Sequence, residues 1–195
     1  MMAVSTSIIA VGLDEAGRGC LAGPVIAGAV VLPDDLSPFE GLTDSKKLSP
    51  KRRETLALSI RTHAMAFSIG RAEPFEIDQY NILRASLLAM QRAFRGIEIP
   101  LDLALIDGLH APDLPVRTQT LVGGDLTEPA ISAASILAKV ARDQEMILAD
   151  ALFPGYGFKV HKGYPTRAHR EALARLGVCP LHRKSFGPVR NLNAR

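Results

Sequence analysis

Short apolar runs rich in β-branched residues alternate with polar, glycine- and proline-bearing stretches along the chain. The runs at 7–13 and 25–32 predict two strands joined through a glycine-rich turn. Three further runs, at 64–72, 101–108 and 118–125, also have the length and composition of strands. The pattern therefore predicts a sheet of five strands.

Helical spacing of apolar residues marks the longer segments between and after these strands. It predicts helices over 50–63, 73–94, 128–152 and 166–177. Ser49 is placed to cap the first helix, and Pro50 suits its first position. Small residues in the third helix would allow close packing, namely Ala130, Ala133, Ala134 and Ala138. Because strands open the chain and then alternate with helices, we expect a mixed α/β sheet rather than a purely parallel one.

The chain shows no linker, internal repeat or low-complexity tract, so we expect a single domain over residues 1–195. Its 47% hydrophobic and 22% charged residues suit one compact core. Two cysteines, Cys20 and Cys179, favour a reduced intracellular protein, with a single disulfide as the alternative.

The N-terminal stretch MMAVSTSIIAVG lacks a basic region and runs into Asp14 and Glu15, which argues against a cleaved signal peptide. The longest uncharged stretch, 19–33, contains Pro24 and is shorter than the ~20 residues that a spanning helix needs. We therefore expect a cytoplasmic protein without membrane contact.

The net charge of +3 hides an uneven distribution. Residues 159–195 hold nine basic residues and one acidic residue, Glu171, which leaves fourteen basic and nineteen acidic residues in the remainder. A basic end segment on an acidic body could reflect chance, a solvated helix or a surface that binds a polyanion. Composition leaves these three open.

Three acidic positions follow apolar runs, namely Asp14 with Glu15, Asp107, and Asp125. Any one of them could simply cap a turn or meet solvent. Ionised carboxylates beside apolar strands are costly unless they are paired or bound to a metal. Together at one sheet edge, carboxylates without His or Cys would suit hard cations such as Mg²⁺ or Mn²⁺.

Successive side chains of a strand point to opposite faces, so Asp14 and Glu15 could both aim at one ion only if the strand ends or twists there. Gly17 and Gly19 supply that freedom and would let a ligand approach the backbone. The segment DEAGRG is not the dinucleotide fingerprint, and the chain holds no phosphate-binding loop of the G-x-x-x-x-G-K-[ST] type. Both facts argue against a nucleotide-cofactor enzyme.

The block DEAGRGCLAGPV at 14–25 resembles the opening motif of the ribonuclease HII family. The other blocks of that family follow in order: TDSKKLSPKRRE at 43–54, IDG at 106–108, GGD at 123–125, ISAASILAKVARD at 131–143, GYGFKVHKGYPTRAH at 155–169 and HRKSFGPVR at 182–190. So many ordered blocks are not expected by chance.

The resemblance implies an RNase H-like α/β fold with a mixed five-stranded sheet flanked by helices and a C-terminal helical segment. It implies an endonuclease that cleaves the RNA strand of RNA–DNA hybrids and nicks duplex DNA on the 5′ side of embedded ribonucleotides. The ends would be 3′-hydroxyl and 5′-phosphate, and the roles would lie in ribonucleotide excision repair and DNA replication. The implied cofactors are two Mg²⁺ or Mn²⁺ ions about 4 Å apart, one activating water and one stabilising the leaving oxygen.

Carried over by motif, the catalytic metal ligands are Asp14, Glu15, Asp107 and Asp125, the acids already singled out. Asp143 in KVARD competes for the fourth place. Its alternative role is an exposed helical acid or a partner of Lys139 or Arg142.

The resemblance assigns Gly17, Arg18 and Gly19 to the ribose 2′-hydroxyl and the adjacent phosphate. It assigns Tyr164 to the sugar that follows the ribonucleotide, where a flat ring packs well against deoxyribose. Many relatives have proline after GRG, whereas this chain has Cys20, which puts the rigidity of the loop in doubt.

Lys46, Lys47 and Lys139 are candidate phosphate contacts, although a lysine is by default a solvated side chain. His161 and His169 flank HKGYPTRAH and could either face the substrate or simply pack. The basic segment 159–195 would bind the nucleic-acid backbone.

Two other functions stay open at this point. Another RNase H-like metal nuclease, such as a junction resolvase, would share the carboxylates but would not need GRG or Tyr164. A nucleic-acid-binding protein would use only the basic segment. We expect a monomer, and contact with a replication clamp is open, because the last residues, VRNLNAR, contain no clear clamp-binding peptide.

Overall fold

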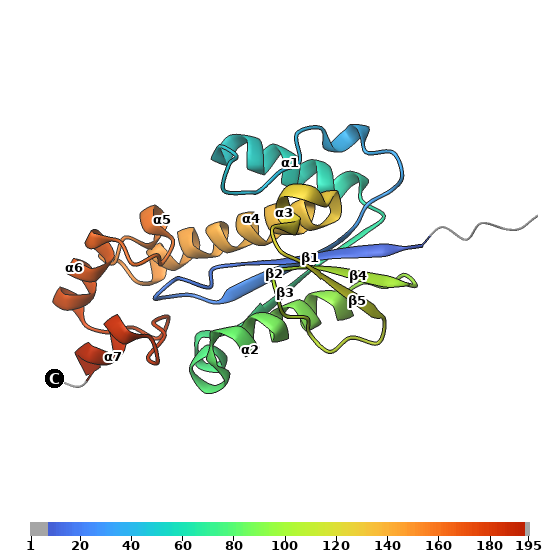
Figure 1. The fold of residues 1–195 in the computed structure, drawn as a ribbon. Helices are drawn as coiled ribbons and strands as arrows, with labels where there is room; N and C mark the ends of the chain where they lie inside the picture. The colour runs from blue at the N-terminus through green and yellow to red at the C-terminus, as the bar shows by residue number, and fades with distance from the viewer. Residues whose placement is uncertain (1–7, 194–195) are drawn as a thin grey trace, which may run out of the picture.

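A mixed five-stranded sheet forms the centre of the computed structural model, which describes residues 8–193 (Figure 1). Its strands are β1 (Ala10–Ala16), β2 (Val25–Val31), β3 (Ala66–Ala72), β4 (Leu103–Asp107) and β5 (Arg117–Leu121). The order across the sheet is β3-β2-β1-β4-β5. Strand β2 runs antiparallel to β1 and β3, whereas β4 and β5 run parallel to β1 and to each other. The predicted mixed sheet is confirmed.

Helices cover both faces of this sheet. They are α1 (Pro50–His63), α2 (Pro74–Arg95), α3 (Gly124–Thr127), α4 (Pro129–Leu152), α5 (Phe158–His161), α6 (Arg167–Leu176) and α7 (Gly187–Asn193), with one 3-10 turn, η1 (Ser37–Phe39). Figure 1 shows α4, α1 and α3 on one side of the sheet, α2 on the other, and α5 to α7 at the far end of α4. The chain is therefore a layered α/β structure with a C-terminal helical segment.

Glycines let α4 approach the sheet closely. A Cβ atom on Gly12 of β1 would lie 2.2 Å from the carbonyl carbon of Ala130, and one on Gly28 of β2 would lie 2.4 Å from the carbonyl oxygen of Ala134. No side chain larger than hydrogen fits at either position. The close packing expected from the small residues of α4 is confirmed.

Two apolar clusters fill the space on either side of the sheet. One joins strands β1, β2 and β4 to α2 and includes Val11, Leu13, Val25, Ile77, Ala89 and Ile106. The other joins the opposite face to α1 and α4 and includes Val30, Leu56, Ile60, Ala134 and Leu137. These two cores fix the strand ends from which the acidic side chains project.

The ends of two predicted strands were wrong. The first strand does not end before its acids, because pairing with β2 continues through Glu15 opposite Ala27 and Ala16 opposite Ile26; its predicted first residue, Ser7, lies outside the described residues. The fifth strand ends at Leu121, because Gly123 takes a left-handed conformation with φ +70° and starts α3. Asp125 therefore lies in a short helix and not at a strand end.

The long helix predicted over 73–94 is interrupted. Asn81 has φ +67°, and its side-chain oxygen accepts a hydrogen bond of 3.1 Å from the backbone N–H of Arg84, so it caps a second helical segment. The cap at Ser49 is confirmed, since its hydroxyl oxygen accepts from the N–H of Arg52. Within residues 8–193, no helix has the length and apolarity to cross a bilayer.

Candidate active site

The fold brings the predicted acids to one edge of the sheet. Asp14 and Glu15 lie in the central strand β1, and Asp107 is the last residue of the neighbouring strand β4. Leu13 pairs with Ile106 in a parallel register. The next residues of the two strands, Asp14 and Asp107, therefore lie at neighbouring positions in the sheet. Asp125 joins them from α3, which follows β5.

Asp14 and Glu15 point to opposite faces of β1, as alternation along a strand requires. The carboxyl of Asp14 is buried, with 5% of the residue exposed, and it accepts a hydrogen bond of 2.6 Å from the backbone N–H of Glu15. The carboxylate of Glu15 accepts a hydrogen bond of 3.0 Å from the guanidinium of Arg18. Each acid therefore has its own partner.

Three of these acids, Asp14, Glu15 and Asp125, have a raised pKa. Burial raises the pKa of Asp14 well above its usual value, and the negative charges of Glu15 and Asp107 raise it further. Burial also raises the pKa of Glu15, against the opposing effect of Arg18. The pKa of Asp125 is raised by burial and by Asp107. A bound cation would relieve this repulsion.

Asp107 and Asp125 are held by neighbours that tie the site together. The carboxylate of Asp107 accepts a hydrogen bond of 2.9 Å from the N–H of Gly124 and so fixes the start of α3. The ammonium of Lys46 lies 3.9 Å from Asp125 and 3.8 Å from Asp44. Asp44, which the sequence reasoning did not single out, thus also lies near this edge of the sheet.

The donor set suits a hard divalent cation, since it consists of carboxylates without His or Cys. Among the described residues, however, no three or more His, Cys, Asp or Glu side chains are grouped closely enough to hold a metal ion. Two basic side chains lie at this edge: Arg18 pairs with Glu15, and Lys46 lies near Asp125. The chemistry of the side chains fits Mg²⁺ or Mn²⁺.

Asp143 pairs with Lys139, one of the two partners considered for it as the alternative to a metal ligand. Its carboxylate accepts a hydrogen bond of 2.7 Å from the ammonium of Lys139, one turn earlier on α4. Such a pair is the ordinary arrangement of opposite charges four residues apart on a helix.

Arg183, fully buried, holds the loop that contains Gly17 and Arg18. Its guanidinium donates to the carbonyl oxygens of Gly17 at 2.8 Å, Arg18 at 2.9 Å and Gly23 at 3.0 Å. Burial lowers the pKa of Arg183 to about 10, so the group remains charged at neutral pH. A buried positive charge whose partners are carbonyl oxygens fixes the loop and adds positive potential beside it.

Arg142, the second fully buried arginine, joins this loop to the turn that contains Tyr164. It donates to the carbonyl oxygens of Ala22 at 3.0 Å and Lys162 at 2.9 Å. A Cβ on Gly17, which has φ +98°, would lie 2.0 Å from the Nε atom of Arg142. Sequence reasoning did not single out either arginine, although both stand in quoted blocks.

Tyr164 lies beside the same loop. The N–H of Leu21 donates to the carbonyl oxygen of Gly163 at 2.8 Å, which joins the two segments directly. Tyr164 is 37% exposed, and the ammonium of Lys139 lies 5.4 Å from the centroid of its ring. The Cys20 side chain lies near Tyr164, and burial raises the pKa of its thiol. The exposed ring thus stands next to the glycine-rich loop.

The remaining candidates fall into two groups. Lys46 and Lys47 are exposed, as lysines usually are. His161 and His169 are buried, which favours packing over substrate contact. The disulfide alternative was wrong, because both cysteines are buried free thiols.

Comparisons with known proteins agree with this arrangement. The family model described as Ribonuclease HII matches residues 11–189. Ribonuclease HII of Coxiella burnetii (strain RSA 493 / Nine Mile phase I) is 57% identical over 187 residues, covering 96% of this chain and 92% of that protein. Ribonuclease HII of Nitrosococcus oceani is 55% identical over 190 residues, covering 96% and 94%.

Solved structures share the fold. Ribonuclease H2 from Pyrococcus horikoshii aligns with a TM-score of 0.82 at 23% identity, over 96% of this chain and 98% of that one. RNase HII from Archaeoglobus fulgidus, solved in a complex with PCNA, gives 0.74 at 27% identity over 92% and 96%. Bst-RNase HIII in complex with Mn²⁺ gives 0.77 at 17% identity over 96% and 70%. The family match and the high identity over nearly the whole chain show that this protein belongs to the ribonuclease HII family and is a ribonuclease.

Proposed function

We propose that this enzyme hydrolyses the RNA strand of RNA–DNA hybrids and nicks duplex DNA on the 5′ side of embedded ribonucleotides, leaving 3′-hydroxyl and 5′-phosphate ends. One observation carries the proposal. The glycine-rich loop directly follows β1, which holds Asp14 and Glu15, and its Leu21 is hydrogen-bonded to the turn that presents Tyr164. A group that can sense a sugar thus stands beside groups that can hold a metal.

Asp14, Glu15, Asp107 and Asp125 would hold two Mg²⁺ or Mn²⁺ ions. When bound, such ions would supply a nucleophilic water of lowered pKa and charge stabilisation for the leaving 3′ oxygen. Until then Arg18 and Lys46 balance part of the negative charge. The other polar groups of the chain bind and orient the substrate.

The loop from Gly17 to Gly19 would recognise the ribose. Arg183 binds the carbonyl oxygens of Gly17 and Arg18 and holds this backbone in place, and glycine lets a 2′-hydroxyl approach it. The Arg18 side chain, 50% exposed, would exchange Glu15 for the adjacent phosphate. The Tyr164 ring would pack on the deoxyribose that follows.

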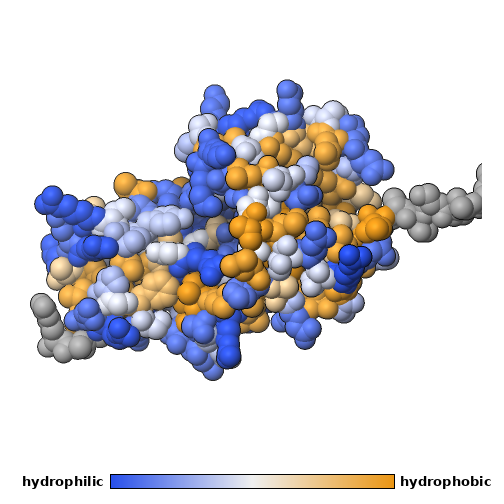
Figure 2. Space-filling view, in the orientation of Figure 1, coloured by the Kyte–Doolittle hydropathy of each residue, from blue (hydrophilic) through white to orange (hydrophobic). Residues whose placement is uncertain are grey.

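The segment 159–195 would hold the duplex backbone. Its exposed basic side chains are Lys159, Arg167, Arg170, Arg175, Lys184 and Arg190, and Arg195 lies outside the described residues. Figure 2 shows hydrophilic side chains gathered over α6 at this end of the molecule. Arg183 belongs to the same segment but is buried, so its charge fixes the glycine-rich loop. Lys46, Lys47 and Lys139 would add phosphate contacts near the acids.

A duplex with one embedded ribonucleotide tests the function directly. With Mg²⁺ or Mn²⁺ we expect one nick 5′ to the ribonucleotide and no cut in an all-DNA duplex of the same sequence. Cutting without regard to ribose would instead indicate another RNase H-like nuclease. Binding without cutting would indicate a nucleic-acid-binding protein.

We expect Tyr164→Ala to reduce kcat/KM at a single embedded ribonucleotide by about 10-fold, since covering part of a ring contributes about 1–2 kcal/mol. Metal affinity should not change. Tyr164→Phe is the matched control, because it keeps the ring and should keep most of the activity. Equal activity of the Ala variant and the wild type would contradict the role of Tyr164.

Asp125→Asn should lower kcat by about 100-fold or more, because a lost metal ligand removes a few kcal/mol of transition-state stabilisation. Asp143→Asn should stay near wild type, since Asp143 pairs with Lys139 on α4. Steady-state rates of both variants at saturating Mg²⁺ decide between them. The reverse order would assign the fourth ligand to Asp143.

Lys46→Ala should make the log–log slope of substrate affinity against salt shallower by about one unit, the contribution of one phosphate contact. Binding of a hybrid at several salt concentrations, without divalent metal, measures this slope. Arg95→Ala, an exposed arginine at the end of α2, is the control and should leave the slope unchanged. An unchanged slope for Lys46→Ala would remove Lys46 from the binding surface.

We propose further that the enzyme works as a cytoplasmic monomer in ribonucleotide excision repair and DNA replication. Its two buried free thiols suit a reducing compartment. A replication clamp is the first protein partner to test, because RNase HII from Archaeoglobus fulgidus was solved with PCNA. Co-elution with a clamp in size-exclusion chromatography would show both the partner and the oligomeric state.

A further inference from the structure

Three buried histidines form a cluster beneath the turn that presents Tyr164. They are His161, His169 and His182, each less than one-tenth exposed. The rings of His161 and His169 stack 4.2 Å apart, and Phe158 packs edge-on against both. None of the three has a role in the proposed chemistry, so their hydrogen bonds need an explanation.

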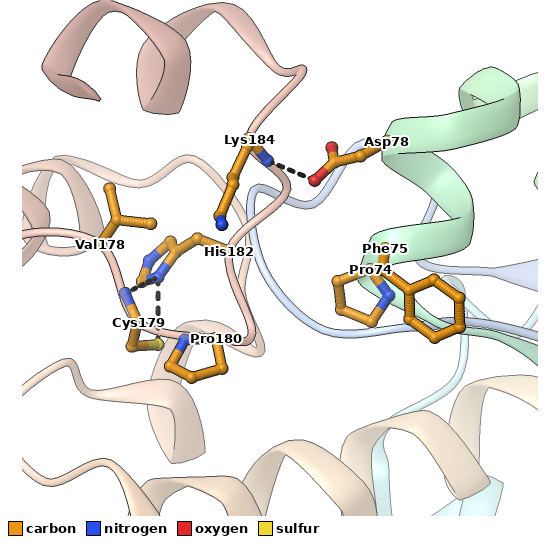
Figure 3. A pocket seen from close by; sticks show the side chains of 8 residues that line it. All are labelled: Pro74, Phe75, Asp78, Val178, Cys179, Pro180, His182 and Lys184. Carbon is orange, nitrogen blue, oxygen red and sulfur yellow. Dashed lines mark hydrogen bonds between the residues drawn. The ribbon is translucent and has the colours of Figure 1, made fainter. Parts of the chain in front are cut away.

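The hydrogen bonds of His182 fix its proton. The backbone N–H of Cys179 donates to its Nδ1 atom at 3.0 Å, so Nδ1 carries no hydrogen (Figure 3). The proton of the neutral ring must therefore lie on Nε2, which is 3.2 Å from the Nε2 atom of His169. His182 thus donates to His169.

His169 connects His182 to the turn that contains Tyr164 through hydrogen bonds of both its ring nitrogens. Its Nε2 atom accepts from His182, so its own proton lies on Nδ1. That Nδ1–H donates to the carbonyl oxygen of Tyr164 at 2.9 Å. A directed relay therefore runs from the Cys179 N–H through two imidazoles to the Tyr164 carbonyl.

His161 holds the other side of the same turn. The N–H of Gly163, the residue before Tyr164, donates to its Nδ1 atom at 3.1 Å. Its Nε2–H donates to the carbonyl oxygen of Tyr156 at 2.8 Å. The N–H of Gly163 and the carbonyl oxygen of Tyr164 are thus both hydrogen-bonded to buried imidazoles, those of His161 and His169.

The relay suits an uncharged state. Burial, and then the neighbouring His169, lower the pKa of His182 to about 4, and burial also lowers the pKa of His169. A proton added to His169 would place two N–H groups against each other at 3.2 Å. Neutral imidazoles with these tautomers satisfy all four ring nitrogens of the pair.

We propose that His169 and His182 are positioning residues that hold the backbone of Tyr164 and so control acceptance of a deoxyribose after the ribonucleotide. The inference rests on the proposed role of Tyr164. It makes both histidines part of substrate selection without contact with substrate, metal or reacting atoms.

Two variants of His169 separate this role from general packing. The amide nitrogen of His169→Asn takes the place of Nδ1 and keeps the donor to Tyr164, whereas His169→Gln replaces Nε2 and loses that donor. The readout is the ratio of kcat/KM at a single embedded ribonucleotide to kcat/KM on a full RNA–DNA hybrid. We expect His169→Gln to lower this ratio about as much as Tyr164→Ala, by about 10-fold, and His169→Asn to keep it.

The double variant His169→Gln, Tyr164→Ala should be no worse than Tyr164→Ala alone, because both act through one ring. Equal loss in the two His169 variants, additive losses or an unchanged ratio in His169→Gln would overturn the inference. If Tyr164→Ala itself leaves the ratio unchanged, the assignment of Tyr164 fails and the inference fails with it. If only His169→Gln is silent, the inference fails alone.

Long-range ¹H–¹⁵N NMR of the wild-type imidazoles gives a test that needs no variant to fold. At pH 7 we expect neutral His169 with its proton on Nδ1 and neutral His182 with its proton on Nε2. A charged ring, or the opposite tautomer at either residue, would overturn the relay.

Discussion

Asp14→Asn will abolish hydrolysis and at the same time raise the melting temperature of the metal-free enzyme. The carboxyl of Asp14 is buried beside Glu15 and Asp107, and its pKa is raised well above the usual value. Asparagine keeps the shape and removes the buried negative charge. In its proposed role as a metal ligand, Asp14 would contribute several kcal/mol of transition-state stabilisation, so we expect kcat to fall on the order of 10³-fold.

The pH dependence of stability follows from the same shift. The folded state holds the proton of Asp14 more tightly than the unfolded state, so ionisation of Asp14 costs stability. This cost is fully present above the raised folded pKa and disappears as the pH falls toward the ordinary value of 3.8. Across that window the metal-free wild type should gain stability relative to Asp14→Asn.

Thermal unfolding in EDTA between about pH 4 and 8, the range over which Asp and His side chains titrate, measures the change in melting temperature. Rates in Mg²⁺ measure the loss of kcat. Asp113→Asn, at an exposed acid, is the control and should change neither. A lower melting temperature of Asp14→Asn in EDTA at neutral pH would show that the carboxylate is not strained by its neighbours.

Gly17→Ala will damage both stability and recognition. Its Cβ would lie 2.0 Å from the Nε atom of buried Arg142, and the residue has φ +98°, a conformation that alanine rarely adopts. Displaced, Arg142 gives up charge-assisted hydrogen bonds to buried carbonyl oxygens. We expect a loss of about 3 kcal/mol or more in the free energy of unfolding and on the order of 100-fold lower kcat/KM at an embedded ribonucleotide.

Gly19→Ala is the matched variant for folding. No heavy atom lies within 4 Å of a Cβ on Gly19, so its melting temperature should equal that of the wild type. Any loss of cleavage in Gly19→Ala then reports contact between substrate and backbone. A Gly17→Ala protein as stable as Gly19→Ala would contradict the close approach of Arg142.

The sequence predicts well what depends on local pattern and on motif. The strands, the capped helix at Ser49 and the neighbouring strand positions of Asp14 and Asp107 follow from apolar runs and the acids beside them. The helical start at Gly124 and the break at Asn81 were not predicted, because one left-handed residue decides each of them. A three- to four-residue change of backbone direction leaves no periodic signal.

The buried arginines and the histidine relay could not be predicted for a different reason. Arg142 binds carbonyl oxygens more than a hundred positions earlier in the chain, and His182 meets His169 across a loop. From the sequence alone, an arginine or a histidine is not expected to be fully buried. Only the tertiary contacts show that these side chains are interior supports.

Helix α4 runs from the acidic edge of the sheet to the glycine-rich loop and the turn that contains Tyr164. Its Ser135 lies near Asp14, and its Arg142, two turns later, holds the loop and turn that would recognise the sugar. At 1.5 Å of rise per residue, these two points are about 10 Å apart. In the proposed function, the offset between the bond that is cut and the sugar that is recognised would therefore be set by the rise of this one helix. One residue inserted between these points would shift the position of the nick or abolish it.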